Sequence, residues 1–390
     1  MSTWLLTATF WCCALGVAYA YFGYPVIIGV LSRVFGRTPE PAQSQGPLPR
    51  VALLIVAHNE ADILKDRIEN ALALDYPRDR LQIVIASDGS DDHTIEVCAR
   101  YADRIRLLAF PERRGKPAAL SAAIGALDAE IVILSDANTL MDSQAALRLA
   151  RWFADQTVGF VCGRLILTDP ESGRNSDSLY WRYESFLKAC EGRLGALLGA
   201  NGAIYALRTS SFVPLPPGTI VDDFVIPLAA RLRTGCRTLH DPQAVAYEVT
   251  APDLGAEFRR RARIGTGAWA SLGSLWPLLS PRHGWTAFAL WSHKVLRWVC
   301  PFLLVGALVC SALLSDRMLY RSAFAAQAAF YLLAAIPPLL PSVRPLRRLR
   351  LCSMFAAMNL ALLVGFFRWL RGDASGVWQR TARAAERSPA

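Results

Sequence analysis

Hydrophobic residues follow different patterns in successive parts of the chain. Residues 4–31 form one long apolar stretch, which predicts a membrane-spanning helix within residues 1–35. Residues 36–50 are rich in proline, glycine and polar side chains and predict a linker. Between residues 51 and 268, short apolar runs alternate with amphipathic stretches. This alternation predicts a folded domain that follows the membrane helix.

Long apolar segments return after Trp269. Residues 269–298 mix tryptophans with basic side chains, which predicts helices in the membrane interface. Residues 299–371 predict C-terminal membrane helices, and residues 372–390 form a basic tail. The expected spans lie near Val299–Leu314, Ser322–Leu340 and Leu351–Leu370. The first of these three is short for a span unless it begins inside the tryptophan-rich segment.

The alternating region predicts an α/β domain. Its apolar runs are typical of strands covered on both faces, and they lie at Val51–Val56, Leu81–Ala86, Ile105–Ala109, Ile131–Leu134 and Val158–Leu167. Amphipathic stretches between them predict helices, the first of which starts at Asn59 and Glu60. Repeated strand–helix units predict a mostly parallel sheet, which binds ligands at the carboxyl ends of its strands.

Composition and charge favour a membrane protein. With 53% hydrophobic and 19% charged residues and a mean hydropathy of +0.27, the chain is too apolar for an ordinary soluble enzyme. The net charge of +10 resides largely in arginines beside the C-terminal apolar segments, which favours a membrane surface over nucleic acid. The nine cysteines are scattered and predict no disulfide framework, so a reducing cytoplasm is expected.

Basic residues also predict the orientation in the membrane. Arg33 and Arg37 follow the first apolar stretch, which places its C-terminal end and the α/β domain in the cytoplasm. Arginines flank the last apolar segment on both sides, and three full crossings cannot place both groups in the cytoplasm. Either the tail lies outside, or one C-terminal segment is interfacial or re-entrant.

Polar residues at two predicted strand ends suggest a site for a nucleotide diphosphate. Asp88 ends one strand, and Asp136 and Asn138 end another. Residues two apart on a strand point to the same side, so Asp136 and Asn138 are expected to share a divalent cation. Asp88 is expected to bind a base or ribose. Lys116, which lies beside Arg114, is expected to bind phosphate or base oxygens. Ordinary turn and capping chemistry is the alternative for these acids.

Two later stretches suit the same site. Gly199–Arg208 is predicted to be a glycine-bearing loop that runs into a strand, and its glycines allow close approach of the backbone to a ligand. Asp222 and Asp223 stand at a predicted helix start, either as capping residues or with one of them as a general base. Arg260 and Arg263 share one face of a predicted short helix, where Arg263 suits a leaving pyrophosphate and a membrane-surface basic patch is the alternative.

Taken together, these motifs resemble those of the membrane-bound family-two glycosyltransferases, which include cellulose, chitin, hyaluronan and ceramide-glucosyl synthases. The resemblance covers roughly Val51 to Gly267. The motifs, in chain order, are Ala57-His-Asn-Glu60, Ser87-Asp-Gly-Ser-Asp-Asp92, Arg114-Gly-Lys116, Ser135-Asp-Ala-Asn138, Gly199-Ala-Asn-Gly-Ala-Ile-Tyr205, Val221-Asp-Asp223 and Arg260-Arg-Ala-Arg263.

The resemblance implies a GT-A fold, which is Rossmann-like, and a nucleotide sugar, most often UDP-linked, used with Mg²⁺ or Mn²⁺. It implies that Asp136 reaches the metal and diphosphate, with Asn138 as a second ligand. Asp223 would be the catalytic base, and Arg263 matches a family arginine. Further substrate-binding residues on the matched motifs would be His58, Glu60, Asp88, Arg114, Lys116, Gly202, Asp222 and Arg260.

Three residues depart from the family pattern. Asn138 replaces the usual second aspartate, Arg260 replaces a glutamine, and Ile264 replaces the tryptophan that lies against the acceptor sugar in processive synthases. Trp269 is a candidate substitute for that tryptophan. Without such an aromatic surface the acceptor is expected to leave after one or a few additions.

The sequence therefore predicts an inverting, UDP-sugar-dependent glycosyltransferase of the bacterial inner membrane, with its catalytic domain in the cytoplasm. The expected acceptor is a membrane lipid or lipid-linked glycan, in envelope or exopolysaccharide synthesis, and no nucleic acid is expected. Two alternatives stay open: a processive polysaccharide synthase, and a non-catalytic nucleotide-binding subunit of a membrane complex. Homo-oligomers or export partners are compatible with each of them.

Overall fold

The computed structural model describes residues 2–37, 40–41, 46–168, 179–249, 254–339 and 347–373. The chain divides into two compact units. Among the described residues, the sheet unit comprises the parts within Ile28–Pro252 and Ser271–Ala287, and the helical unit comprises the parts within Met1–Ile27, Asp253–Ala270 and Phe288–Ala374. The basic tail from residue 374 onward, and positions 38–39 and 42–45 of the predicted linker, lie outside the described residues.

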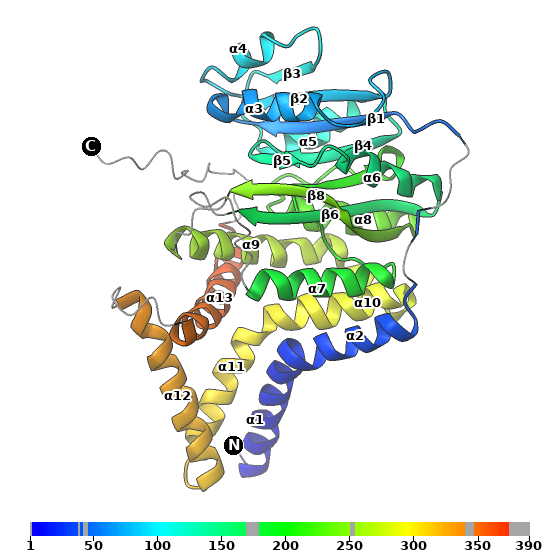
Figure 1. Cartoon of the computed structure of the whole chain (residues 1–390). Coiled ribbons are helices and arrows are strands. Elements are labelled where there is room, and N and C mark those ends of the chain that lie inside the picture. The colour runs from blue at the N-terminus through cyan, green and yellow to red at the C-terminus, as the bar shows by residue number, and fades with distance from the viewer. Residues whose placement is uncertain are drawn as a thin grey trace. The chain divides into compact units, whose positions relative to one another are not determined.

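One eight-stranded sheet forms the centre of the sheet unit, in the order β3-β2-β1-β4-β7-β6-β8-β5 (Figure 1). The first four strands in that order are parallel, whereas β7 is antiparallel to both β4 and β6, and β5 to β8. The strands are β1 (Val51–Ala57), β2 (Leu81–Asp88), β3 (Arg106–Phe110), β4 (Ile131–Asp136), β5 (Thr139–Met141), β6 (Val158–Thr168), β7 (Tyr205–Arg208) and β8 (Arg237–Val249).

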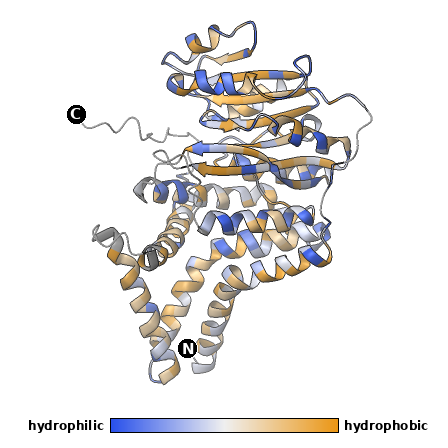
Figure 2. Cartoon of the chain, in the orientation of Figure 1, coloured by the Kyte–Doolittle hydropathy of each residue, from blue (hydrophilic) through white to orange (hydrophobic). Residues whose placement is uncertain are grey.

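The parallel strands are buried on both faces, which explains their continuous apolar runs. Leu53 and Ile133 pack on one face with Leu64, which comes from α3. Leu54 and Val132, on the other face, are equally inaccessible. Figure 2 shows these strands as mostly hydrophobic. The main helices of this unit are α3 (Ala61–Leu72), α4 (Thr94–Ala99), α5 (Lys116–Gly125), α6 (Ala145–Ala150), α7 (Leu179–Arg193) and α8 (Asp222–Thr234).

The five predicted strands are confirmed as β1, β2, β3, β4 and β6, with ends shifted by a residue or two, and the strand expected at the end of Gly199–Arg208 is confirmed as β7. Two strands escaped prediction. β8 contains an Asp–Pro pair at Asp241, which disguised its strand character, and β5 has only three residues. β4 ends at Asp136, so Asn138 lies in the turn before β5. The premise that Asp136 and Asn138 share one strand is therefore wrong.

Four helical segments in the described residues are long and apolar enough to cross a membrane: Thr3–Val34, Trp285–Leu313, Met318–Ile336 and Leu351–Leu370. They agree with the four predicted spans. The second begins at Trp285, inside the segment predicted to be interfacial, which resolves the shortness of that span. The helices are α1 (Thr3–Ala18), α2 (Tyr24–Val34), α10 (Trp285–Ala289), α11 (Leu296–Leu313), α12 (Met318–Leu339) and α13 (Arg347–Leu370), with π-helical turns at Tyr19–Gly23 and Leu290–Val295.

Helix α9 (Leu254–Leu275) carries the arginine-rich motif. It has 22 residues, so the expectation of a short helix is wrong. The helix continues because an apolar face follows the arginines. A Cβ added at Gly265 would lie 3.3 Å from the Cα of Leu362 in α13. Both residues belong to the helical unit.

Candidate active site

The carboxyl ends of β2 and β4 place Asp88 and Asp136 along one edge of the sheet. Strand β1 lies between them, with Ala57 opposite Ser87 and Val56 opposite Asp136. The predicted meeting of these two strand ends at one edge is therefore confirmed.

Asp88 shapes the loop that precedes α5. Its Oδ1 accepts a hydrogen bond from the backbone N–H of Arg114, and its Oδ2 one from that of Gly115, both at 2.8 Å. Its backbone carbonyl lies 2.8 Å from His58 Nδ1. Gly89 has a φ of 63°, and a Cβ there would lie 2.4 Å from the backbone nitrogen of Arg113, so only glycine fits. Asp88 thus fixes the start of the helix that presents Lys116, and its contact with a nucleotide base stays a prediction.

Lys116 lies between two carboxylates. Its Nζ donates a hydrogen bond of 2.7 Å to Asp136 Oδ1 and lies 3.5 Å from Asp222 Oδ2. Burial opposes the ammonium charge, but Asp136 and Asp222 outweigh it and raise the pKa of Lys116. The lysine is therefore a fixed positive charge at physiological pH.

Gly202 brings the backbone of a third segment to the same place. A Cβ at this position would lie 3.3 Å from Asp136 Oδ2 and 3.9 Å from Lys116 Nζ. A small cavity is lined by Lys116, Asp136, Gly202 and Tyr205. The absent side chain at Gly202 leaves room for a ligand beside the carboxylate.

Asp222 and Asp223 are the first two residues of α8, and Val221 is the residue before the helix. No side-chain cap is formed there, so the capping interpretation is wrong. Burial and the charge of Asp222 raise the pKa of Asp223 to about 6, against the opposing effect of Lys116 and Lys188. Within the described part of the chain, the half-buried Asp223 carboxylate accepts no hydrogen bond. It is therefore uncommitted and close to the pKa that suits a general base.

The sequence patterns did not indicate two basic residues that lie near the site. Lys188 of α7 donates a hydrogen bond of 3.0 Å to the carbonyl of Ala200 and another to Asn201 Oδ1. Arg67 of α3 is 1% exposed and reaches the backbone carbonyl of Asp136 at 3.4 Å. Burial lowers the pKa of Arg67 to about 10, although Asp136 counteracts it. Both basic residues lie on helices, where the sequence pattern does not distinguish a buried charge from an exposed one.

The remaining predicted residues have other contacts. Asn138 donates from Nδ2 to Glu248 Oε1 at 3.0 Å. Glu60 is buried at the start of α3, where its N–H donates to Thr94 Oγ1 at 2.9 Å. The Arg114 guanidinium lies over the ring of Phe110, 5.0 Å from its centroid. Substrate binding by these residues stays a prediction.

Arg260 and Arg263 belong to the helical unit. Arg260 forms a two-pronged pair with Glu257, at 2.8 Å from Nε and 3.1 Å from Nη2. Trp269 packs against the rings of Phe366 and Trp369, at centroid distances of 5.0 and 6.0 Å. With its ring in this aromatic cluster, Trp269 is a poor substitute for a tryptophan that stacks on an acceptor sugar.

The residues present fit a divalent cation that is held jointly with a substrate. No group of three or more histidine, cysteine or acidic side chains within the described residues is arranged to hold a metal by itself. Asp136, however, has a side chain one-third exposed, and its Oδ2 accepts no hydrogen bond from a described residue. Mg²⁺ and similar ions are commonly held by one or two carboxylates together with substrate phosphates, which is the arrangement that Asp136 allows.

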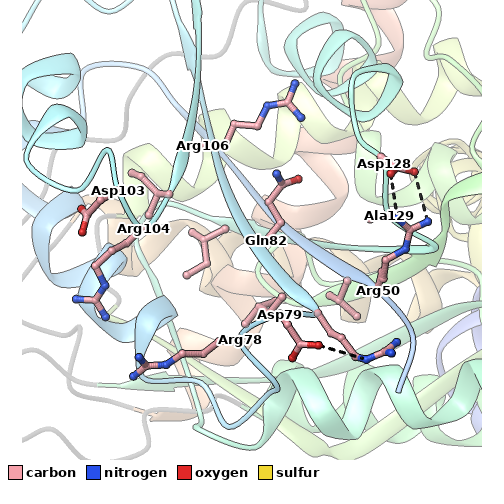
Figure 3. A pocket seen from close by; sticks show the side chains of 14 residues that line it. Arg50, Arg78, Asp79, Gln82, Asp103, Arg104, Arg106, Asp128 and Ala129 are labelled. Carbon is pink, nitrogen blue, oxygen red and sulfur yellow. Dashed lines mark hydrogen bonds and ion pairs between the residues drawn. The ribbon is translucent and has the colours of Figure 1, made fainter. Parts of the chain in front are cut away.

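A second cavity, of about 440 Å³, lies at the opposite edge of the sheet, at the amino ends of β1, β2 and β3 (Figure 3). It is lined by five arginines and shares no residue with the site at the carboxyl edge. Arg50 pairs with Asp128 at 2.9 Å, and Arg106 donates to the carbonyl of Ala126 at 3.1 Å. Several of these arginines therefore satisfy nearby acids and carbonyl groups.

Comparison with known proteins identifies the family. The glycosyl transferase family 2 model matches residues 52–208, and the glycosyl transferase family group 2 model matches residues 131–367. The latter spans more than half of the chain, so the protein belongs to the family-two glycosyltransferases. Of the site residues, Asp88 and Lys116 lie only in the first matched range, Asp222 and Asp223 only in the second, and Asp136 and Gly202 in both.

Similar proteins act on glycans. A poly-β-1,6-N-acetyl-D-glucosamine synthase of Staphylococcus aureus (strain MSSA476) is 26% identical over 228 residues, which are 56% of this chain and 55% of the relative. An N-acetylglucosaminyltransferase of Mesorhizobium japonicum is 29% identical over 236 residues, with the same coverage of each chain. The chain thus spans about half the length of the curated relatives it matches.

A solved structure has the same fold. The mannosyltransferase PcManGT from Pyrobaculum calidifontis, in complex with GDP-Man and Mn²⁺, has a TM-score of 0.67 and 22% sequence identity, and the match covers 92% of this chain and 98% of that one. The GT-A fold implied by the sequence resemblance, flanked by apolar helices, is thereby confirmed.

Proposed function

We propose that this glycosyltransferase is an inverting enzyme of the bacterial inner membrane that transfers a sugar from a UDP-sugar to a lipid-linked or glycan acceptor on the cytoplasmic side. The observation that carries the proposal is the arrangement of Lys116 between Asp136 and Asp222, next to the uncommitted Asp223. It provides positive charge for a leaving diphosphate and a base for an attacking hydroxyl. The bacterial relatives and the four apolar helices support the location.

In the proposed reaction Asp223 accepts the proton of the acceptor hydroxyl as that oxygen attacks the anomeric carbon. The bond from this carbon to the diphosphate breaks, and the electron pair leaves with the nucleoside diphosphate. Lys116 stabilises the departing negative charge. A single displacement inverts the configuration of the anomeric carbon, and one base suffices for it. When bound at Asp136, Mg²⁺ or Mn²⁺ would supply further charge neutralisation for the diphosphate.

The donor is tested by nucleotide release from detergent-purified protein. The panel should include UDP-N-acetylglucosamine, because both curated relatives are named for this sugar. It should also include GDP-mannose, the donor bound to PcManGT. Release from a UDP-sugar that increases with added membrane lipid supports the proposal. Release from GDP-mannose alone would overturn the UDP assignment, and no release from any donor would favour a non-catalytic subunit.

A processive synthase is the second candidate, because the relative from S. aureus is named for a polymer product. Against it, Ile264 offers no aromatic surface, and Trp269 is packed among other rings. Loss of an aromatic contact costs about 1 kcal/mol, so a glycan end leaves more readily between additions. We therefore expect one or a few sugars per acceptor. Size separation of radiolabelled product decides this, and high-molecular-weight polymer made without added acceptor would establish the processive alternative.

A further inference from the structure

Lys188 holds the segment between Gly199 and Gly202 by hydrogen bonds and has no role in the reaction proposed above. Helix α7 directs its ammonium group to the segment between Gly199 and Gly202, where it donates to the carbonyl of Ala200 and to the side-chain oxygen of Asn201. Both acceptors are neutral. Within the described part of the chain, Lys188 has no carboxylate in ion-pair range, in contrast to Lys116.

The tethered segment is bound on several sides. The N–H of Ala200 donates to the backbone carbonyl of Asp223 at 2.8 Å. The N–H of Asn201 donates to Cys162 Sγ, and its Nδ2 to the carbonyl of Gly163, each at 3.2 Å. The next residue, Gly202, faces Asp136. One ammonium group thus holds the short segment that joins the first turn of α8 to the Asp136 side of the site.

The charge of Lys188 also acts on the base. Four charged groups from four elements influence Asp223: Asp222 of α8, Asp136 of β4, Lys116 of α5 and Lys188 of α7. The two acids and burial raise its pKa, and the two lysines lower it. Lys116 is already paired with Asp136 and Asp222, whereas Lys188 forms no ion pair within 4 Å with an acid among the described residues. Burial and Lys188 also lower the pKa of His240 to about 4.

We propose that Lys188 is a positioning residue for sugar transfer, whose ammonium group holds Ala200 and Asn201 against the start of α8, where Asp223 lies. It has two separable functions, a hydrogen-bonded tether and a positive charge. The inference rests on the proposed function, since it takes Asp223 as the base. It adds a residue on α7 that contacts neither reacting atom.

The test compares K188Q, K188R and K188M in the full-length protein, by measuring kcat and kcat/KM as functions of pH. K188Q keeps an N–H donor without the charge, so we expect the acid limb of kcat/KM to move to higher pH by about one unit. Its rate at high pH should approach that of the wild type. K188R keeps the charge, and its acid limb should stay in place. K188M loses the tether as well, so its rate should also fall at high pH.

Lys65, an exposed residue of α3, provides the matched control. K65M should have the wild-type profile, which excludes a general effect of removing one positive charge. If K188M does not fold, the comparison of K188Q with K188R still decides the role of the charge. An acid limb of K188Q that coincides with the wild type, while D223N is inactive, would overturn this inference and leave the proposed function intact. Full activity of D223N would instead refute the base assignment itself.

Discussion

The two edges of the same parallel strands use charge in opposite ways. At the carboxyl edge, the Lys116 side chain is 27% exposed and lies between two acids, which raise its pKa although burial opposes this. At the amino edge, the side chains of Arg50 and Asp128 are 52% and 91% exposed. Water screens the Arg50–Asp128 pair, whereas Lys116 and its acidic neighbours are only partly hydrated.

This contrast shows why a concentration of charge is not evidence of a site by itself. The amino edge has the larger cavity and more basic residues (Figure 3). Three of its arginines, Arg50, Arg80 and Arg106, nevertheless pair with exposed acids or donate to backbone carbonyls. The carboxyl edge leaves the carboxylate of Asp223 half-buried, with a raised pKa and without a hydrogen bond from a described residue. A carboxylate without a hydrogen-bond partner in a partly dehydrated site is the stronger indication of a catalytic role.

The largest effect is expected from Asp223→Asn. The amide cannot accept the acceptor proton, so transfer should fall by roughly 10²–10⁴-fold, the usual contribution of a general base. Donor binding, measured by calorimetry with UDP, should be preserved, because Lys116 and Asp136 are untouched. D128N at the amino edge is the matched control and should retain full activity. Near-wild-type turnover in D223N would move the base to Asp222 or elsewhere.

A smaller effect is expected from removing divalent cations. If Asp136 shares a metal with the donor diphosphate, UDP affinity should fall by more than about tenfold in EDTA, because the metal contributes several kcal/mol of charge stabilisation. D136N should abolish this metal dependence, whereas N138A should weaken it less, since Asn138 also bonds to Glu248. Calorimetry with and without Mn²⁺ measures both. Equal affinity in EDTA would contradict metal-assisted binding.

The pH dependence follows from the raised pKa of Asp223. A general base must be deprotonated, and its pKa here is about 6, so kcat/KM should fall as the pH decreases through 6. Below that point the decline should approach about tenfold per pH unit, as for a single titrating group. An aspartate at its ordinary pKa would keep the enzyme fully active at pH 5. A profile that is flat from pH 5 to 8 would therefore show that burial does not shift this group.

The smallest effect is expected at the amino edge. The Arg50–Asp128 pair is exposed, so a double-mutant cycle with R50M and D128N should give a coupling energy below about 1 kcal/mol. Chemical denaturation of the four proteins measures it. A coupling energy of several kcal/mol would mean that this edge is less hydrated than its exposure indicates, and the contrast between the two edges would weaken.

Much of the fold follows from local patterns in the sequence. Continuous apolar runs predicted β1, β2 and β4, because strands buried on both faces need apolar residues at every position. The same logic predicted four apolar membrane helices. Strand β8 was missed because its alternation is broken at Asp241 and Pro242, and because its partner β6 is distant in sequence. The turn at Asn138 was missed because a short-range pattern does not show where β4 ends.

The sequence by itself determined the order of motifs and the residues that end the parallel strands, since strand ends meet at one edge whenever the sheet is parallel. Only the tertiary structure decided which contacts each of these residues makes. Asp88 accepts hydrogen bonds from the loop before α5, and Asp222 and Asp223 do not cap α8. Lys188 of α7 donates a hydrogen bond to the Ala200 carbonyl. Hydrogen-bond partners and burial depend on contacts between segments far apart in the chain, and these contacts set the pKa of Asp223. Local periodicity carries no information about them.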